Sequence, residues 1–186
     1  MTTYDVIVFL PEGFEEIEAV TTIDILRRGG VNTLSVSLTD RLSVTGSHDI
    51  TVTADALFDD LNTTDVTGTM LILPGGPGTV NYKEHLSLMN LIKTHGNNGG
   101  LLAAICAAPT VLGHLGLLKD KTAVCYPGME SQLGATKIGE TNVITYQNIT
   151  TSKGPATSTA FAIQLVSILK GAETARKVAK NLLYTG

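Results

Sequence analysis

The sequence predicts an α/β fold in which a doubly wound, mostly parallel sheet carries helices on both faces. Continuous apolar runs of strand length, of which residues 5–10 are the first, are typical of strands buried on both faces of a parallel sheet. These runs alternate with stretches of helical periodicity, and no linker, internal repeat or low-complexity tract separates them. We therefore expect a single domain over residues 1–186.

The first half of the chain predicts a β-α-β unit followed by a hairpin at the margin of the sheet. Pro11-Glu12-Gly13 ends the first apolar run, and Gly29-Gly30 ends the helical pattern that follows. Parallel strands with a right-handed crossover are expected for such a unit. The expected elements are a strand over 5–10, a helix over 14–28, a strand over 32–38 and a hairpin of 42–44 with 50–52.

The second half begins with a buried apolar strand that the glycine-rich segment 74–78 closes. Gly171 divides the two helices expected at the end of the chain. The expected strands span 69–73, 101–105, 122–125, 143–148 and 149–152, and the expected helices span 79–95, 109–114, 154–170 and 173–183.

Charge and composition narrow the classes of partner. The chain is 43% hydrophobic and 16% charged, with a net charge of -4 and no cluster of lysine or arginine, so we expect neither nucleic acid nor a membrane surface as a partner. A secretory leader pattern and an apolar run of 18 residues are both lacking, which predicts a cytoplasmic protein. A disulfide between Cys106 and Cys125 is not expected in that compartment.

The expected strand 101–105 runs directly into Cys106, Ala107, Ala108 and Pro109. Small residues two positions before and after Cys106 give the small-x-nucleophile-x-small form of a nucleophile elbow, in which a strand turns sharply into a helix. The positive end of that helix favours a thiolate over a thiol. We predict a reactive thiolate at Cys106; the alternative is a small, inert cysteine in the core.

Three carboxylates, Glu15, Glu16 and Glu18, open the first expected helix, and complementing the helix dipole is their ordinary role. One helical turn can point Glu18 inward while Glu16 remains in water. A carboxyl group beside a thiolate should keep its proton, because two adjacent anions raise the pKa of one of them. Glu18 would then donate a hydrogen bond to sulfur or move a proton to and from a substrate.

The loop 74–78 is rich in glycine but lacks the Gly-Lys-Ser/Thr of a phosphate-binding loop, so no nucleotide is expected. Its ordinary role is a tight turn from strand to helix. Its functional role would be to place the N–H of Gly76 beside that of Ala107 or Cys106 as an oxyanion hole.

Neither a metal nor a cofactor is expected. The two cysteines lack the C-x-x-C spacing of a zinc site, and the histidines are not at ligand spacing. Surface positions are the expected role of the histidines at 85, 95 and 114.

Four motifs in chain order resemble the DJ-1/PfpI (ThiJ) superfamily, and its DJ-1-like branch in particular. They are Phe14-Glu15-Glu16-Ile17-Glu18, Leu73-Pro74-Gly75-Gly76, Ala104-Ile105-Cys106-Ala107-Ala108-Pro109 and Thr151-Ser152-Lys153-Gly154-Pro155. The resemblance implies a flavodoxin-like sandwich, usually a homodimer, in which the elbow cysteine Cys106 lies beside a protonated Glu18. It also implies oxyanion-type amides at Gly76 and Ala107.

The resemblance extends to positions around the pocket, and three of them depart from the family pattern. Ala107 replaces the histidine of the protease-like branch, which argues against a cysteine peptidase. Tyr126 stands where a histidine is usual, and a phenol is a poor base near neutral pH. His48 stands where an arginine is expected, which weakens an anion-binding corner. The positions expected to line the pocket are Glu15, Arg28, His48, Gly75, Tyr126 and Pro127.

By resemblance, the expected activity is that of a cofactor-independent glyoxalase or deglycase acting on small reactive dicarbonyls such as methylglyoxal. The alternative is an oxidative-stress sensor or a protein-protecting, chaperone-like module, in which Cys106 is oxidised to a sulfinic acid held by Glu18. The same thiol serves both functions, so the sequence leaves both open.

Overall fold

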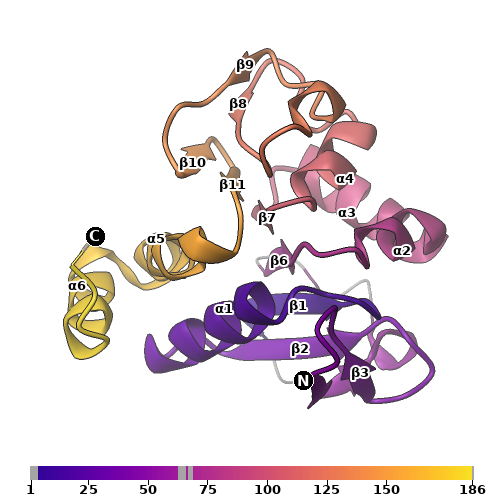
Figure 1. Cartoon of the computed structure of the whole chain (residues 1–186), viewed down its shortest axis with the longest axis horizontal. Helices are drawn as coiled ribbons and strands as arrows, with labels where there is room; N and C mark the ends of the chain where they lie inside the picture. Colours follow the sequence, from indigo (N-terminus) through magenta and orange to yellow (C-terminus); the bar gives the residue numbers. More distant parts are fainter. Residues whose placement is uncertain (1–3, 63–65, 67–68, 186) are drawn as a thin grey trace.

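The computed structural model describes residues 4–62, 66 and 69–185. Its main sheet has seven strands in the order β10-β11-β7-β6-β1-β2-β5 (Figure 1). All neighbouring strands are parallel except the pair β10–β11. The mostly parallel α/β sheet predicted from the sequence is therefore confirmed. The strands are β1 (Val6–Leu10), β2 (Thr33–Ser37), β5 (Ala56–Leu57), β6 (Met70–Leu73), β7 (Leu102–Ile105), β10 (Val143–Tyr146) and β11 (Ile149–Ser152).

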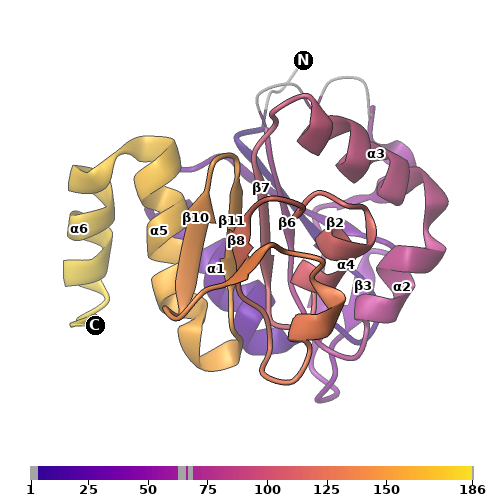
Figure 2. The ribbon, with the colours of Figure 1, turned by 90° about the horizontal axis from the view of Figure 1, so that it is seen from above.

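Helices cover both faces of this sheet, as Figures 1 and 2 show. One face packs against α1 (Glu16–Arg28) and α5 (Ser158–Lys170), which contact each other, and α6 (Ala172–Asn181) packs outside α5. The other face packs against α2 (Thr79–Glu84), α3 (Leu86–Asn97) and α4 (Pro109–His114). Strands β1, β6 and β7 are buried along their whole length because both faces are covered, which explains their unbroken apolar sequences.

Three local expectations need correction. The helix expected over 79–95 is two helices, because His85 leaves the helical conformation and its ring nitrogen Nδ1 accepts a hydrogen bond from Leu88 N at the start of α3. The strand expected over 122–125 is the short β8 (Thr122–Ala123), which pairs with β9 (Lys137–Ile138) outside the main sheet. The hairpin of β3 (Ser43–Thr45) and β4 (Thr51–Thr53) also forms its own small sheet.

The parallel order brings the loops that follow β1, β6 and β7 to one edge of the sheet. The completely buried Tyr82 bridges the ends of β1 and β6. Its hydroxyl is within hydrogen-bond distance of the carbonyls of Phe9 (3.0 Å) and Pro74 (2.9 Å). Functional side chains on these loops therefore converge at the carboxyl ends of the strands. Within the described part of the chain, every helix is too short or too polar to cross a membrane.

Candidate active site

Cys106 lies at the sharp turn between β7 and α4. Its φ of 64° is in the left-handed region, which costs a non-glycine residue about 1–3 kcal/mol. Backbone hydrogen bonds hold this conformation: Cys106 N donates to Ser152 O (2.9 Å), and Tyr126 N donates to Cys106 O (2.8 Å). The strand, strained turn and helix of a nucleophile elbow are thus all present.

Glu18 lies in the first turn of α1 and is completely buried. Its Oε2 accepts a hydrogen bond of 2.7 Å from the backbone N–H of Gly75, its Oε1 is buried without a hydrogen-bond partner among the described residues, and its carboxyl group lies close enough to Cys106 for the two to perturb each other's pKa. Glu15 fixes this turn of the helix, because its Oε2 caps the N–H of Glu18 at 2.7 Å. The structure therefore brings the predicted carboxyl group and the predicted nucleophile into direct contact.

Burial raises the pKa of both members of this pair. Removal from water raises the pKa of Glu18 to about 7, against the opposing hydrogen bonds from Cys106 and Gly75 N. Burial also raises the pKa of Cys106 to about 12, the charge of Glu18 adds to the rise, and hydrogen bonds from the amides of Ala107 and Gly76 oppose it. The sequence predicted a lowered thiol pKa, and this direction is wrong, because the amides at the elbow do not outweigh burial and the adjacent carboxylate.

The two groups consequently titrate as a pair rather than independently. A thiolate is most accessible while Glu18 is neutral, because a neutral carboxylic acid no longer repels the sulfur anion and has a proton to donate to it. Catalysis by Cys106 therefore depends on the protonation state of Glu18.

Glycine is required at positions 75 and 76 beside this pair. A Cβ atom at Gly75 would lie 2.7 Å from Cys106 Cβ and 2.8 Å from Glu18 Oε2, too close for either to remain in place. Gly76 has a φ of 99°, and a Cβ there would lie 2.6 Å from Glu15 N. With these glycines the loop after β6 approaches closely enough for the Gly76 amide, together with that of Ala107, to reach the Cys106 sulfur. These are the two amides that the sequence indicated as an oxyanion hole.

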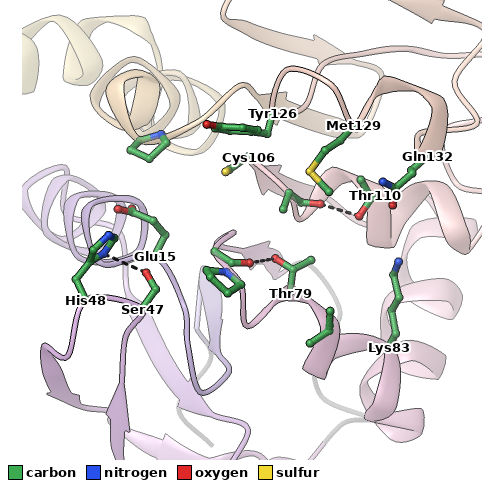
Figure 3. Close-up of a pocket in the computed structure, with 15 residues that line it drawn as sticks. Glu15, Ser47, His48, Thr79, Lys83, Cys106, Thr110, Tyr126, Met129 and Gln132 are labelled. Atoms are coloured by element: carbon green, nitrogen blue, oxygen red, sulfur yellow. Dashed lines mark hydrogen bonds between the residues drawn. The ribbon is translucent and has the colours of Figure 1, made fainter.

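Cys106, although only 7% exposed, lines an open cavity of about 580 Å³ (Figure 3). Six of the residues singled out from the sequence line this cavity: Glu15, His48, Gly76, Cys106, Ala107 and Tyr126. The residues that line the cavity but were not expected there are Ser47, Pro77, Thr79, Val80, Lys83, Thr110, Met129, Gln132 and Pro155, of which Pro77 lies in the loop 74–78 and Pro155 ends the fourth motif.

Three residues expected to line the pocket lie elsewhere. Arg28 is in the last turn of α1, where its Nε bonds to Asp24 Oδ2 at 2.6 Å. A helix rises about 1.5 Å per residue, so Arg28 lies roughly 15 Å along α1 from Glu18. Gly75 is buried beneath Cys106, and Pro127 is exposed beyond Tyr126.

Glu16 was expected in water, but it is buried and pairs with the β3–β4 hairpin. Its carboxylate accepts hydrogen bonds from His48 N (2.6 Å), the Nδ1 atom of His48 (2.8 Å) and Ser47 Oγ (3.2 Å). Burial favours the neutral acid, but these donors outweigh it and lower the pKa of Glu16 to about 2. Glu16 in turn raises the pKa of His48, through its hydrogen bond and its negative charge.

The histidines also need one correction, since His95 was expected at the surface and is buried, which lowers its pKa. Among the described residues, Glu15, Glu16 and His48 bring potential metal ligands within 4.8 Å of one another. Each carboxylate already has a protein partner: Glu15 caps α1 and Glu16 binds the hairpin. This arrangement explains the cluster without a metal ion.

Comparison with known proteins places these features in context. The family model described as the DJ-1/PfpI family matches residues 4–168. The chain is 39% identical to Protein DJ-1 homolog A of Arabidopsis thaliana over 97% of this chain and 47% of that protein, and thus spans about half its length. It is 34% identical to the Glutathione-independent glyoxalase DJR-1.2 of Caenorhabditis elegans, over 92% of this chain and 91% of that protein.

A solved structure described as Toxoplasma gondii DJ-1, oxidized, superposes with a TM-score of 0.89. It shares 38% sequence identity, and the match covers 99% of this chain and 100% of that one. The similarity therefore includes both the sheet and the edge at which the cavity lies.

The coupling of the pair predicts that Glu18→Gln lowers the apparent pKa of Cys106, by about one unit or more, because it removes the buried carboxylate that repels the thiolate. The measurement is the rate of alkylation by iodoacetamide from neutral to strongly alkaline pH, in a Cys125→Ser background so that Cys106 alone reports. Glu84→Gln, which neutralises an exposed carboxylate on α2, is the control. An unchanged or higher pKa in Glu18→Gln would contradict the coupling.

Proposed function

The chain belongs to the DJ-1/PfpI family, and we propose that it is a cofactor-independent glyoxalase that converts small reactive dicarbonyls to hydroxy acids at Cys106. The observation that carries the proposal is the coupling of Cys106, which lines an open cavity, to the fully buried Glu18 behind it. A relative named as a glutathione-independent glyoxalase supports it.

The reaction begins with addition of sulfur to the aldehyde carbon of methylglyoxal. Glu18 takes the thiol proton as the S–C bond forms and passes it to the carbonyl oxygen, which completes a hemithioacetal and returns Glu18 to its carboxylate form. The amides of Gly76 and Ala107 lie beside the sulfur, where they stabilise negative charge on the oxygen as it develops. No external cofactor is consumed in this step.

The second stage is an internal transfer of hydrogen between adjacent carbons. Glu18 removes the proton from the former aldehyde carbon as the neighbouring carbonyl oxygen is protonated, which gives an enediol. Glu18 then delivers the proton to the neighbouring carbon while the hydroxyl on the sulfur-bearing carbon loses its own proton, which leaves a thioester of lactate. Water then cleaves the C–S bond, releasing lactate and restoring the thiol. A pKa of about 7 suits Glu18 to this role, since both protonation states are available near neutral pH. A deglycase would apply the same thiol to adducts that dicarbonyls form with amines or thiols.

Cys106→Ser should abolish lactate formation from methylglyoxal, because a serine hydroxyl beside Glu18 is a far weaker nucleophile. Glu18→Gln should lower kcat by about 10²–10⁴, since it removes the group that transfers the proton. Lactate is measured directly, and Cys125→Ser, a change at a buried cysteine outside the cavity, is the control that should remain active. Full turnover by Cys106→Ser would exclude the mechanism.

The second candidate function is that of an oxidation sensor at the same sulfur. It is favoured by the access that the cavity gives to Cys106, and by the similarity to a relative solved in a form described as oxidized. Two molecules of hydrogen peroxide would each transfer one oxygen to sulfur and leave as water, producing a sulfinate. A neutral Glu18 would donate a hydrogen bond to that sulfinate.

Mild peroxide treatment should therefore add two oxygens to Cys106 before Cys125, because Cys106 lines the cavity and Cys125 does not. Peptide mass spectrometry over a time course measures both sites in one sample. Equal oxidation of the two cysteines would argue against a sensor, and Glu18→Gln should change the rate at Cys106 alone.

We also propose that the chain forms a homodimer through the outer face of α1. Ile17 and Val20 expose 56% and 46% of their area on this helix, and Ile50 of the adjacent hairpin exposes 55%. The hairpin lies against α1 through the bonds of Ser47 and His48 to Glu16. Exposed apolar groups gathered in this way are typical of an interaction surface.

Light scattering should give a molar mass of twice 19.6 kDa, and the double change Ile17→Glu with Val20→Glu should reduce it to that of one chain, because charge in an apolar interface is costly to bury. Leu86→Glu, at a 74% exposed position on α3, is the matched control and should leave the mass unchanged. A wild-type mass of 19.6 kDa would contradict the dimer.

A further inference from the structure

The cavity is much larger than the substrate of the proposed reaction requires. Its volume of about 580 Å³ falls within the roughly 300–1,000 Å³ typical of sites for drug-sized ligands. A three-carbon dicarbonyl bonded to Cys106 occupies only a small part of it. The chemistry of the remaining wall therefore indicates what else the substrate carries.

Lys83 supplies a free positive charge on that wall. Its side chain extends from α2 along the cavity toward Gln132, on the side away from Glu15 and His48 (Figure 3). Over residues 4–62, 66 and 69–185, Lys83 Nζ has neither an ion-pair partner nor a hydrogen-bond acceptor.

Gln132 provides a second donor on the wall of the cavity. It ends the short 3₁₀ helix Glu130–Gln132, and its side-chain amide makes no hydrogen bond to any other residue that the structure describes. The two nearby hydroxyls are already committed, because Thr110 Oγ1 donates to Ala107 O (2.8 Å) and Thr79 Oγ1 donates to Gly76 O (2.7 Å). On this wall, Lys83 and Gln132 are thus the side chains whose hydrogen-bond donors are free to bind a ligand.

The two ends of the cavity differ in the charge of the residues that line them. Of the residues that line it, Glu15 alone carries a carboxylate, and it lies with His48 on the opposite side of Cys106 (Figure 3). An anionic group at the Lys83 end therefore meets no carboxylate among the residues that line the cavity. Met129 lies between Cys106 and Gln132 and offers an apolar contact to the part of the substrate that joins its two ends.

We propose that the cavity selects α-oxoaldehydes that carry a carboxylate remote from the aldehyde, and that Lys83, with Gln132, binds that carboxylate. This assignment deepens the proposed glyoxalase function and rests on it for the chemistry at Cys106. Lys83 is accordingly a specificity-determining residue and takes no part in the transfer of hydrogen.

The test compares two substrates that differ by one carboxylate group, phenylglyoxal and 4-carboxyphenylglyoxal. Lys83→Met should raise KM for 4-carboxyphenylglyoxal about fivefold to tenfold, the loss expected for one charge-assisted hydrogen bond at an open site. KM for phenylglyoxal and kcat for both substrates should remain within about twofold, since no group at the reacting atoms changes. Lys83→Arg should restore most of the affinity.

Lys93→Met, an exposed lysine on α3 outside the cavity, changes the net charge equally and is the control. If Lys83→Met raises KM for both substrates alike, or Lys93→Met has the same effect, the carboxylate site is refuted. A smaller KM increase from Gln132→Leu, again confined to the charged substrate, would support the paired donors.

A binding measurement separates this proposal from the proposed reaction. Calorimetric titration of the Cys106→Ser variant with 4-acetylbenzoate and with acetophenone requires no turnover. The carboxylated ketone should bind more tightly, and adding Lys83→Met should remove the difference. Equal binding of the two ketones would overturn the carboxylate site even in an active glyoxalase, whereas preferential binding by an enzyme inactive on both aldehydes would overturn the reaction alone.

Discussion

The electrostatic coupling between buried Glu18 and Cys106 is the interaction on which the rest of the site depends. Neither group is stable there alone, because a carboxylate and a thiolate are both costly to remove from water. Burial raises the pKa of Glu18 and so keeps its proton in place, the interaction with Cys106 opposes that rise, and a protonated Glu18 is a donor for the sulfur when it ionises. Each part of the fold around them serves to hold this contact at the floor of an open cavity.

Three parallel strands make the contact possible, since the loops after β1, β6 and β7 meet at one edge of the sheet. The loop after β1 leads into α1 and its capping Glu15, the loop after β6 contributes the glycines, and the turn after β7 carries the sulfur. The close approach depends on the absence of a Cβ at Gly75, which would fall between the two reacting groups. The strained φ of Cys106 is maintained because its amide and carbonyl are both bonded to neighbouring segments.

The elements that could be predicted are those whose signal is local. Apolar runs predicted the buried strands, and the small residues around Cys106 predicted the elbow, since both patterns follow from the backbone of a few consecutive residues. The pairing of Glu16 with His48 could not be predicted, because it joins residues separated by 32 positions and reverses the expected exposure of Glu16. Lys83 was missed for the same reason: nothing near it in sequence shows that α2 borders the cavity. His85 interrupts a continuous helical periodicity, and only its capping hydrogen bond to Leu88 reveals the break.

The two candidate functions place different demands on one carboxylic acid. An oxidation sensor needs Glu18 only as a proton donor, so any pKa well above neutrality would serve. Transfer of hydrogen between carbons needs the same group to release and regain a proton in each cycle, which a group with a very high pKa does slowly as a base. Burial raises the pKa of Glu18, while the Gly75 amide and Cys106 restrain the rise, and the resulting value of about 7 leaves both protonation states populated. This balance is what a proton-transferring acid and base requires, so the proposed catalytic function depends on it more closely than a sensor in which Glu18 only stabilises an oxidised sulfur.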